Sequence, residues 1–346
     1  MISTDSINSA TSPTVLPGGS LQVKVTNPPV VEYAKNGNMF VGLFANTVTT
    51  TDIVVGTATS MQIVTMPVAD RWNGICYHKK TGKFYLTGFT SPNLYVSADG
   101  LTWTTLVPGV DIPQSVANTY PVAGGDSITF IPHTGSNTAA TYGLIFEDGS
   151  VTYAVGNSIA CNASRYGLGC TNDGDRGAWI FSSTIYWNVS GIDILTASSS
   201  PQSIGSPVSI AAGGNIALAG DRLITVSGAV VYVNNLLKTG LGAVVQFTLP
   251  ITPSNYAILV DGNAYTILSQ NSLYAYQTSD FGVTWSAVPI SGIDKTAQFY
   301  GATSLNGTPV IFTSLGVYVG VADGGIKVIP QYTSSTPGQK YVVKAK

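Results

Sequence analysis

Residues 278–285 read Thr278-Ser-Asp-Phe-Gly-Val-Thr-Trp285, and residues 97–103 read Ser97-Ala-Asp-Gly-Leu-Thr-Trp103, one residue shorter between Asp and Gly. An Asp carboxylate can accept backbone N–H groups of its own turn, and Gly adopts the positive φ that tight turns require. The Trp ring can then fold back and pack between sheets. The two stretches therefore predict the same tight turn at two distant places, which indicates an internal repeat.

Weaker copies of this turn occur at residues 146–153, 188–193 and 321–327, and fainter ones at 51–53 and 232–235. Successive copies are separated by about 42 to 49 residues, the period of a four-stranded propeller blade. The seven turn positions are Asp52, Asp99, Asp148, Ser190, Asn234, Asp280 and Asp323. The spacing predicts an all-β chain that forms a seven-bladed β-propeller of four-stranded antiparallel blades.

The segments before these turns repeat as well. Each is an apolar strand followed by a strand with a Tyr, and the pair has the length of two strands in a hairpin. The clearest pairs are 84–87 with 94–95, 179–182 with 185–186, 223–226 with 231–232, 265–268 with 273–274, and 310–313 with 317–318. Upstream turns such as Lys35-Asn-Gly37, Lys80-Thr-Gly82 and Asn306-Gly307 supply the preceding hairpin, so four strands per unit follow.

The composition supports this fold and excludes several functions. Only 9% of the residues are charged, against about a quarter in ordinary domains, and Gly, Pro and Tyr number 38, 18 and 18. Such a chain favours strands and turns over helices. The net charge of −2 gives no electrostatic basis for nucleic-acid binding. No apolar run approaches the ~18 residues that span a bilayer, so we expect no membrane insertion.

Motifs for cofactors, metals and disulfides are missing from the sequence. The cysteines, Cys76, Cys161 and Cys170, are three in number and have no CxxC spacing, so they predict buried free thiols. The two histidines, His78 and His133, are too far apart in sequence to suggest a metal site. We therefore expect no cofactor and no metal. The first residues lack the basic and apolar regions of a signal peptide, so we expect no signal peptide and synthesis in the cytoplasm.

The turn at Thr278 to Trp285 resembles the Asp-box, or BNR repeat, of sialidases, sortilins and other propellers, whose pattern is Ser/Thr-x-Asp-x-Gly-x-Thr-Trp. The resemblance implies that the box residues lie on outer hairpins, away from the central channel, and are structural. These residues are Ser97, Asp99, Gly100, Trp103, Thr278, Asp280, Gly282 and Trp285. We expect Trp103 and Trp285 to be largely buried between blades.

Catalysis is not indicated. The resemblance raises the alternative of a sialidase-like glycosidase, whose family uses an arginine triad with a Tyr–Glu pair and an Asp. The Phe/Tyr-Arg-Ile-Pro stretch of that family is absent, and only Arg71 and Arg165 precede predicted inner strands. Two arginines do not make a triad, so these two are candidates for binding at the channel face. We predict that the chain is not an enzyme.

The ends of the chain differ from the repeats. Residues 1–29 are predicted as an extended N-terminal arm, 30–330 as the propeller, and 331–346 as a polar C-terminal tail. Within the arm, Leu21 to Val25 could instead be a strand that completes a blade of the ring.

Few charges, a Thr/Ser/Asn/Gly/Tyr-rich surface and this arm resemble bacteriophage tail and adsorption proteins that carry Ser-x-Asp-Gly-x-x-Trp repeats. The resemblance implies a virion structural protein, an attachment or receptor-binding propeller docked through its arm. It would be made in the cytoplasm of a host cell, with the virion as its final location. Its partners would be other virion proteins, copies of itself, and a cell-surface glycan or protein receptor. The alternatives are a glycan-binding propeller and a cellular assembly-factor scaffold.

Overall fold

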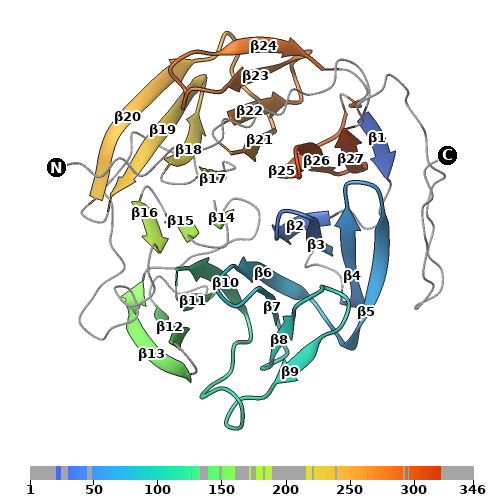
Figure 1. Cartoon of the computed structure of the whole chain (residues 1–346), viewed down its shortest axis with the longest axis vertical. Helices are drawn as coiled ribbons and strands as arrows, with labels where there is room; N and C mark the ends of the chain where they lie inside the picture. The colour runs from blue at the N-terminus through green and yellow to red at the C-terminus, as the bar shows by residue number, and fades with distance from the viewer. Residues whose placement is uncertain are drawn as a thin grey trace.

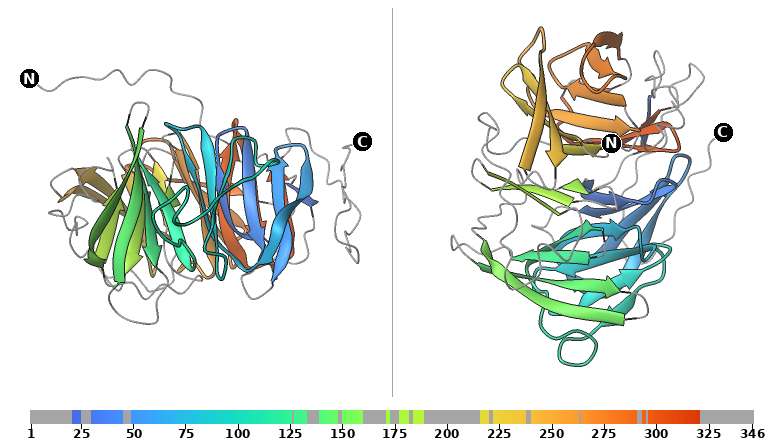
Figure 2. Two further views of the ribbon diagram at one scale, coloured as in Figure 1. Left: turned by 90° about the horizontal axis from the view of Figure 1, so that it is seen from below. Right: turned by 60° about the vertical axis from the view of Figure 1, so that its left-hand side comes forward.

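Seven antiparallel sheets surround one axis and form a β-propeller (Figure 1). Edge-on, the ring is a flattened disc whose strands run between its two faces (Figure 2, left). The computed structural model describes residues 21–24, 30–44, 49–125, 127–132, 139–147, 150–159, 171–172, 177–181, 184–188, 216–219, 222–237, 240–262, 264–290, 293–294 and 296–320. In these residues six sheets have four strands and one has three. The predicted seven-bladed fold is confirmed.

The first three blades follow one another along the chain. Blade 1 contains β2 (Val30–Lys35), β3 (Met39–Phe44), β4 (Thr50–Thr57) and β5 (Met61–Asp70). Blade 2 contains β6 (Trp72–His78), β7 (Lys83–Gly88), β8 (Leu94–Ser97) and β9 (Thr104–Leu106). Blade 3 contains β10 (Thr119–Gly124), β11 (Ser127–Pro132), β12 (Ala139–Glu147) and β13 (Ser150–Ile159).

The remaining blades continue the ring. Blade 4 has three described strands, β14 (Thr171–Asn172), β15 (Gly177–Phe181) and β16 (Thr184–Asn188). Blade 5 contains β17 (Ala217–Ala219), β18 (Arg222–Ser227), β19 (Val230–Leu237) and β20 (Gly240–Thr248). Blade 6 contains β21 (Tyr256–Asp261), β22 (Ala264–Ser269), β23 (Tyr274–Thr278) and β24 (Ser286–Pro289). Blade 7 contains β25 (Phe299–Leu305), β26 (Thr308–Thr313), β27 (Gly316–Gly320) and β1 (Leu21–Lys24).

The first strand of each blade lies nearest the axis (Figure 1). Each of these strands contacts the first strand of the next blade, and β25 of blade 7 contacts β2 of blade 1, so the ring is closed. Neighbouring blades cover these strands on both sides, and β10 is buried at all six positions. This burial on both sides explains why the sequences of the innermost strands consist of apolar or small residues instead of alternating apolar and polar ones.

The ring closes through the N-terminal strand. β1 lies outside β27, and its register runs from Leu21 opposite Gly320 to Lys24 opposite Val317. Figure 1 shows β1 beside β27 in a blade otherwise formed by the end of the chain. Residues 21–24 therefore complete the last blade, which was the alternative to an extended arm. The predicted arm thus loses these residues, and residues 1–20 and the predicted tail at 331–346 lie outside the described residues.

The predicted strand pairs and hairpin turns are found, but two of the seven predicted turn positions are wrong. Asp52 lies inside β4 and Asn234 inside β19. A Thr-Asp or Asn-Asn pair is compatible with a turn locally, yet here each pair lies within a continuous strand. The positions at Asp148, Ser190 and Asp323 lie outside the described residues.

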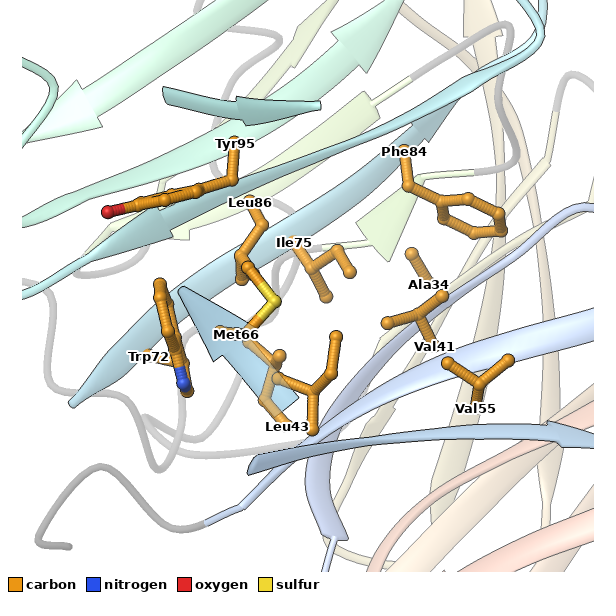
Figure 3. Packing of buried hydrophobic residues seen from close by; sticks show 11 residues of the cluster. Ala34, Val41, Leu43, Val55, Met66, Trp72, Ile75, Phe84, Leu86 and Tyr95 are labelled. Atoms are coloured by element: carbon orange, nitrogen blue, oxygen red, sulfur yellow. The ribbon is translucent and has the colours of Figure 1, made fainter. Parts of the chain in front are cut away.

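Apolar clusters fill the spaces between blades. In the cluster between blades 1 and 2, Met66 of β5 lies beside Trp72 of β6, and Leu86 and Tyr95 complete the contact from blade 2 (Figure 3). Trp72 is 1% exposed, and its ring meets that of Tyr95 edge to face with centroids 5.2 Å apart. The core is thus a series of interfaces between blades, arranged around the axis.

Candidate functional site

The turn after β8 has the hydrogen bonds that its sequence predicts. Asp99 accepts the backbone N–H groups two and three residues further on, at 2.9 and 2.8 Å. The hydroxyl of Ser97 donates to Asp99 at 3.0 Å and accepts the N–H of Gly100 at 2.8 Å. The indole N–H of Trp103 donates to the carbonyl of Gly100 at 2.9 Å. Both ends of the turn are therefore held by side chains of the turn itself.

The turn after β23 repeats this arrangement. Asp280 accepts the N–H of Thr284 at 2.8 Å, its hydroxyl at 2.6 Å, and the hydroxyl of Thr278 at 2.8 Å. Thr278 in turn accepts the N–H of Gly282 at 2.9 Å, and Trp285 donates to the carbonyl of Gly282 at 3.0 Å. These groups bond to one another within the turn, which supports a structural role.

Each turn also seats its glycine against the preceding blade. Gly100 and Gly282 have φ angles of +69° and +88°. A Cβ on Gly100 would approach a methyl of Val41 in blade 1 to 2.8 Å, and one on Gly282 would approach Val233 in blade 5 to 2.9 Å. Glycine is thus required at both positions for two reasons: the backbone has a positive φ angle, and a Cβ would prevent the close approach of the two blades.

The two box tryptophans are less buried than predicted. Trp103 and Trp285 are half-buried, each packed on the cluster between its own blade and the preceding one. The ring of Trp285 stacks on Phe247 of β20 with centroids 5.1 Å apart. Each indole therefore packs on the interface between two blades without being fully enclosed.

The Asp99 turn should make stability pH-dependent. The N–H of Thr102 lowers the pKa of Asp99 below its ordinary 3.8; desolvation opposes this, and the N–H of Leu101 and the Ser97 hydroxyl reinforce it. The stabilisation is therefore present above pH 3.8 and is lost as the pH falls through the folded-state pKa. Asp99→Ala should lower the unfolding free energy by about 1 kcal/mol near neutral pH, as loss of a capping side chain does. The melting temperatures of the two proteins should converge only once the pH has fallen below the folded-state pKa of Asp99. A gap that stays constant in acid would contradict the role of the charged form.

The two faces of the ring carry different connections. Because neighbouring strands are antiparallel, the first and third strands of a blade begin at the end where the second and fourth finish. We call this end the upper face; it carries the connections between consecutive blades that the structure describes. The opposite, lower face carries the box turns and the hairpins between first and second strands. The longest described connection, 107–118, belongs to the upper face, where loops are free to carry binding residues.

Arg71 lies on the upper face. It is the whole connection between β5, which ends at Asp70, and β6, which begins at Trp72. Its guanidinium carbon lies 3.9 Å from the centre of the Phe89 ring, in the loop after β7. The side chain is partly exposed. The other predicted channel-face residue, Arg165, lies outside the described residues.

A buried carboxylate holds the loop beneath Arg71. Asp70 is 1% exposed and accepts the N–H of Arg71 at 2.7 Å. It also accepts the N–H and hydroxyl of Thr90, the hydroxyl at 2.8 Å, and the N–H of Ser91 at 2.7 Å. Gly88 leaves the space that the carboxylate fills. Asp70 therefore connects the end of blade 1 to the loop after β7 in blade 2. Because Phe89 directly precedes the two loop residues that Asp70 binds, its position is fixed as well.

Neutral amides occupy other upper-face connections. Asn118 and Asn255 end the connections before β10 and β21 and have φ angles of +56° and +45°. Asn tolerates this left-handed conformation better than most residues. The side chain of Asn255 accepts the N–H of Phe299 in blade 7 at 3.1 Å and donates to Gln270 at 3.2 Å. The upper face thus combines one stacked arginine with amides fixed by hydrogen bonds.

Sequence reasoning singled out Arg71 but missed Asp70, Phe89, Asn118 and Asn255. Apart from the bond between Asp70 and the adjacent Arg71, their partners lie 15 or more residues away in sequence, so no local pattern predicts these contacts. For Asn118 and Asn255, the available sequence signal was their position directly before an apolar inner strand. In the described part of the chain, no three His, Cys, Asp or Glu side chains gather into a group able to hold a metal ion. The same residues include no helix long and apolar enough to cross a membrane.

Comparison with known proteins establishes the class of fold. Neither a protein-family model nor a curated protein sequence matches the chain. Solved β-propellers do. A structure of YCF48 bound to D1 peptide has a TM-score of 0.54 and 13% identity, covering 90% of this chain and 98% of that one. Virginiamycin B lyase from Staphylococcus aureus, with quinupristin, has a TM-score of 0.53 and 15% identity, covering 87% and 98%. YCF48 from Cyanidioschyzon merolae has a TM-score of 0.50 and 13% identity, covering 86% and 97%.

The chain is therefore similar to complete propellers along nearly its whole length. At these identities the likeness concerns the fold alone, because the propellers that share it include both a peptide-bound protein and a lyase.

Proposed function

We propose that this chain is a non-catalytic binding propeller that holds a segment of a partner protein on its upper face within a larger assembly. The observation that carries the proposal is the make-up of that face. Arg71 presents a partly exposed guanidinium there, on a connection that the buried carboxylate of Asp70 holds in place. Asn255 ties another connection of that face to Phe299. A guanidinium donates to peptide oxygens, and fixed loops lower the entropy lost on binding.

Two further points support this function. The box turns, which are the strongest sequence motifs, are occupied with their own hydrogen bonds and lie on the opposite face. The likeness to a propeller that was solved with a bound peptide is consistent with a scaffold that recruits a protein segment. Both points favour the cellular assembly-factor type of scaffold over a glycosidase.

A virion remains the second candidate for the assembly. Its support is compositional: 9% charged residues and a surface rich in Thr, Ser, Asn, Gly and Tyr, as in phage tail and adsorption proteins. On this proposal the partners are other virion proteins and copies of the chain, and the ring serves host attachment. Residues 1–20 would be the docking segment, because β1 is already used to close the ring.

The proposal is tested by offering peptides and glycans to the same protein. The immobilised chain is screened in parallel against a random-peptide display library and a glycan array. We expect selected peptides to bind, and to lose about tenfold or more in affinity with Gln298→Trp, which places a bulky ring before β25 on the upper face.

The control is Ser279→Trp, an equally exposed position on the lower face in the turn after β23. It should leave peptide binding unchanged. Binding to glycans without any peptide would favour the glycan-binding alternative, and equal losses in both variants would reject the upper face as the site.

A further inference from the structure

The surroundings of Arg71 point to a specific ligand chemistry. We propose that Arg71 is a receptor for a peptide carboxylate, supplied either by a C-terminus or by an acidic side chain of the partner segment. This inference rests on the proposed peptide-binding function and names the group that the site selects.

The root of the side chain is fixed on both sides. The N–H of Arg71 donates to Asp70 at 2.7 Å, and its carbonyl accepts the N–H of Phe89 at 2.9 Å. The guanidinium carbon then lies over the Phe89 ring, 3.9 Å from its centre. Contact with the ring attracts the cation without supplying an oxygen acceptor, so its five N–H donors stay available.

Those donors have no partner in the described part of the chain. Apart from its backbone bonds, Arg71 makes only the contact with Phe89 there. The neighbouring acid, Asp70, is saturated by donors from its own loop. A guanidinium that is oriented, partly desolvated and not neutralised is matched by a carboxylate, which accepts two parallel N–H bonds. A neutral ligand would leave the charge uncompensated.

The chain contains its own control for this geometry. Arg222, at the start of β18, lies over the Phe281 ring at 5.3 Å, on the lower face. Arg222 thus also has a phenylalanine ring beside its guanidinium, but it lies on the opposite face, and the Tyr265 hydroxyl lies within its electrostatic reach. A general attraction of arginines for anions would act on both groups, whereas a receptor would act on Arg71 alone.

The experiment is a side-chain NMR titration of the whole chain labelled with 15N-arginine. The sequence has four arginines, so few Nε–H signals arise, and Arg71→Lys assigns the one of interest. The probes are acetyl-Gly-Gly with a free carboxylate, acetyl-Gly-Gly-amide, and acetyl-Asp-amide. We expect the Arg71 signal to shift saturably with one or both carboxylates and to stay still with the amide, while Arg222 does not respond.

The two carboxylate probes distinguish a C-terminus from an acidic side chain. In binding assays with selected peptides, Arg71→Lys should weaken affinity about tenfold, because Lys keeps the charge but loses the bidentate fork. Equal shifts of Arg71 and Arg222, or an equal response to the amide, would overturn the proposal. So would peptides that bind the upper face and are indifferent to Arg71→Lys; that result would leave the proposed function standing. Absence of any peptide binding would instead reject the proposed function.

Discussion

Trp72→Ala should lower the free energy of unfolding by about 4 kcal/mol, as for other fully buried aromatic residues replaced by Ala. Trp72 is 1% exposed, and its ring fills the interface between blades 1 and 2 against Met66 and Tyr95 (Figure 3). Ala would leave a cavity that the rigid strands on either side cannot close. Urea denaturation followed by far-UV circular dichroism measures the loss.

Two controls separate packing from other effects. Trp103→Ala, at the half-buried edge of the same cluster, should lower the free energy of unfolding by about half as much, because the Trp103 side chain buries less apolar surface on folding than Trp72 does. Trp72→Phe keeps a ring and removes an indole N–H that is buried without a partner among the described residues. It should therefore cost clearly less than Trp72→Ala. Similar losses for Trp72→Ala and Trp103→Ala would mean that the interface between these blades is not packed as described.

Asp70→Ala should destabilise the chain by about 3 kcal/mol, since it removes a buried charged acceptor that holds donors from three residues. The carboxylate accepts bonds from Arg71, Thr90 and Ser91 and is 1% exposed. Its loss should also free the loop that carries Phe89. Chemical denaturation gives the free energy, and hydrogen exchange at residues 88–91 should speed up more than in the rest of blade 2.

The matched control is Asp111→Ala. Asp111 is exposed and accepts one backbone bond, from Val107 at 2.8 Å, so its removal should cost less than about 1 kcal/mol. Asp70→Asn should be intermediate, because the amide keeps one acceptor oxygen but turns an N–H₂ group toward donors. If Asp70→Ala proves as mild as Asp111→Ala, Asp70 does not hold the two blades together.

Local patterns identified the fold because a propeller repeats them. The turns at Asp99 and Asp280 are built from their own side chains, so their hydrogen bonds were predictable from a few adjacent residues. The same reasoning failed at Asp52 and Asn234, which look like turn residues but lie inside strands. There, pairing with the neighbouring strand outweighs the preference of the residue itself.

The candidate site was less predictable. Arg71 was singled out because it precedes an inner strand, but nothing near it in sequence indicates Phe89 beneath its guanidinium. Asp70 reaches Thr90 across the gap between two blades, and Asn255 reaches Phe299 in the same way. Such contacts depend on how blades are placed side by side, which short-range spacing does not encode.

The sequence by itself determined the all-β class, the seven blades, and the two turns whose bonds are local. Only the tertiary structure decided how the ring closes, which tryptophans are fully buried, and what surrounds Arg71. The N-terminal strand pairs with β27 almost 300 residues away. The reason is physical: turn and strand preferences act over a few residues, whereas closure and burial depend on the surfaces that the completed blades present to each other.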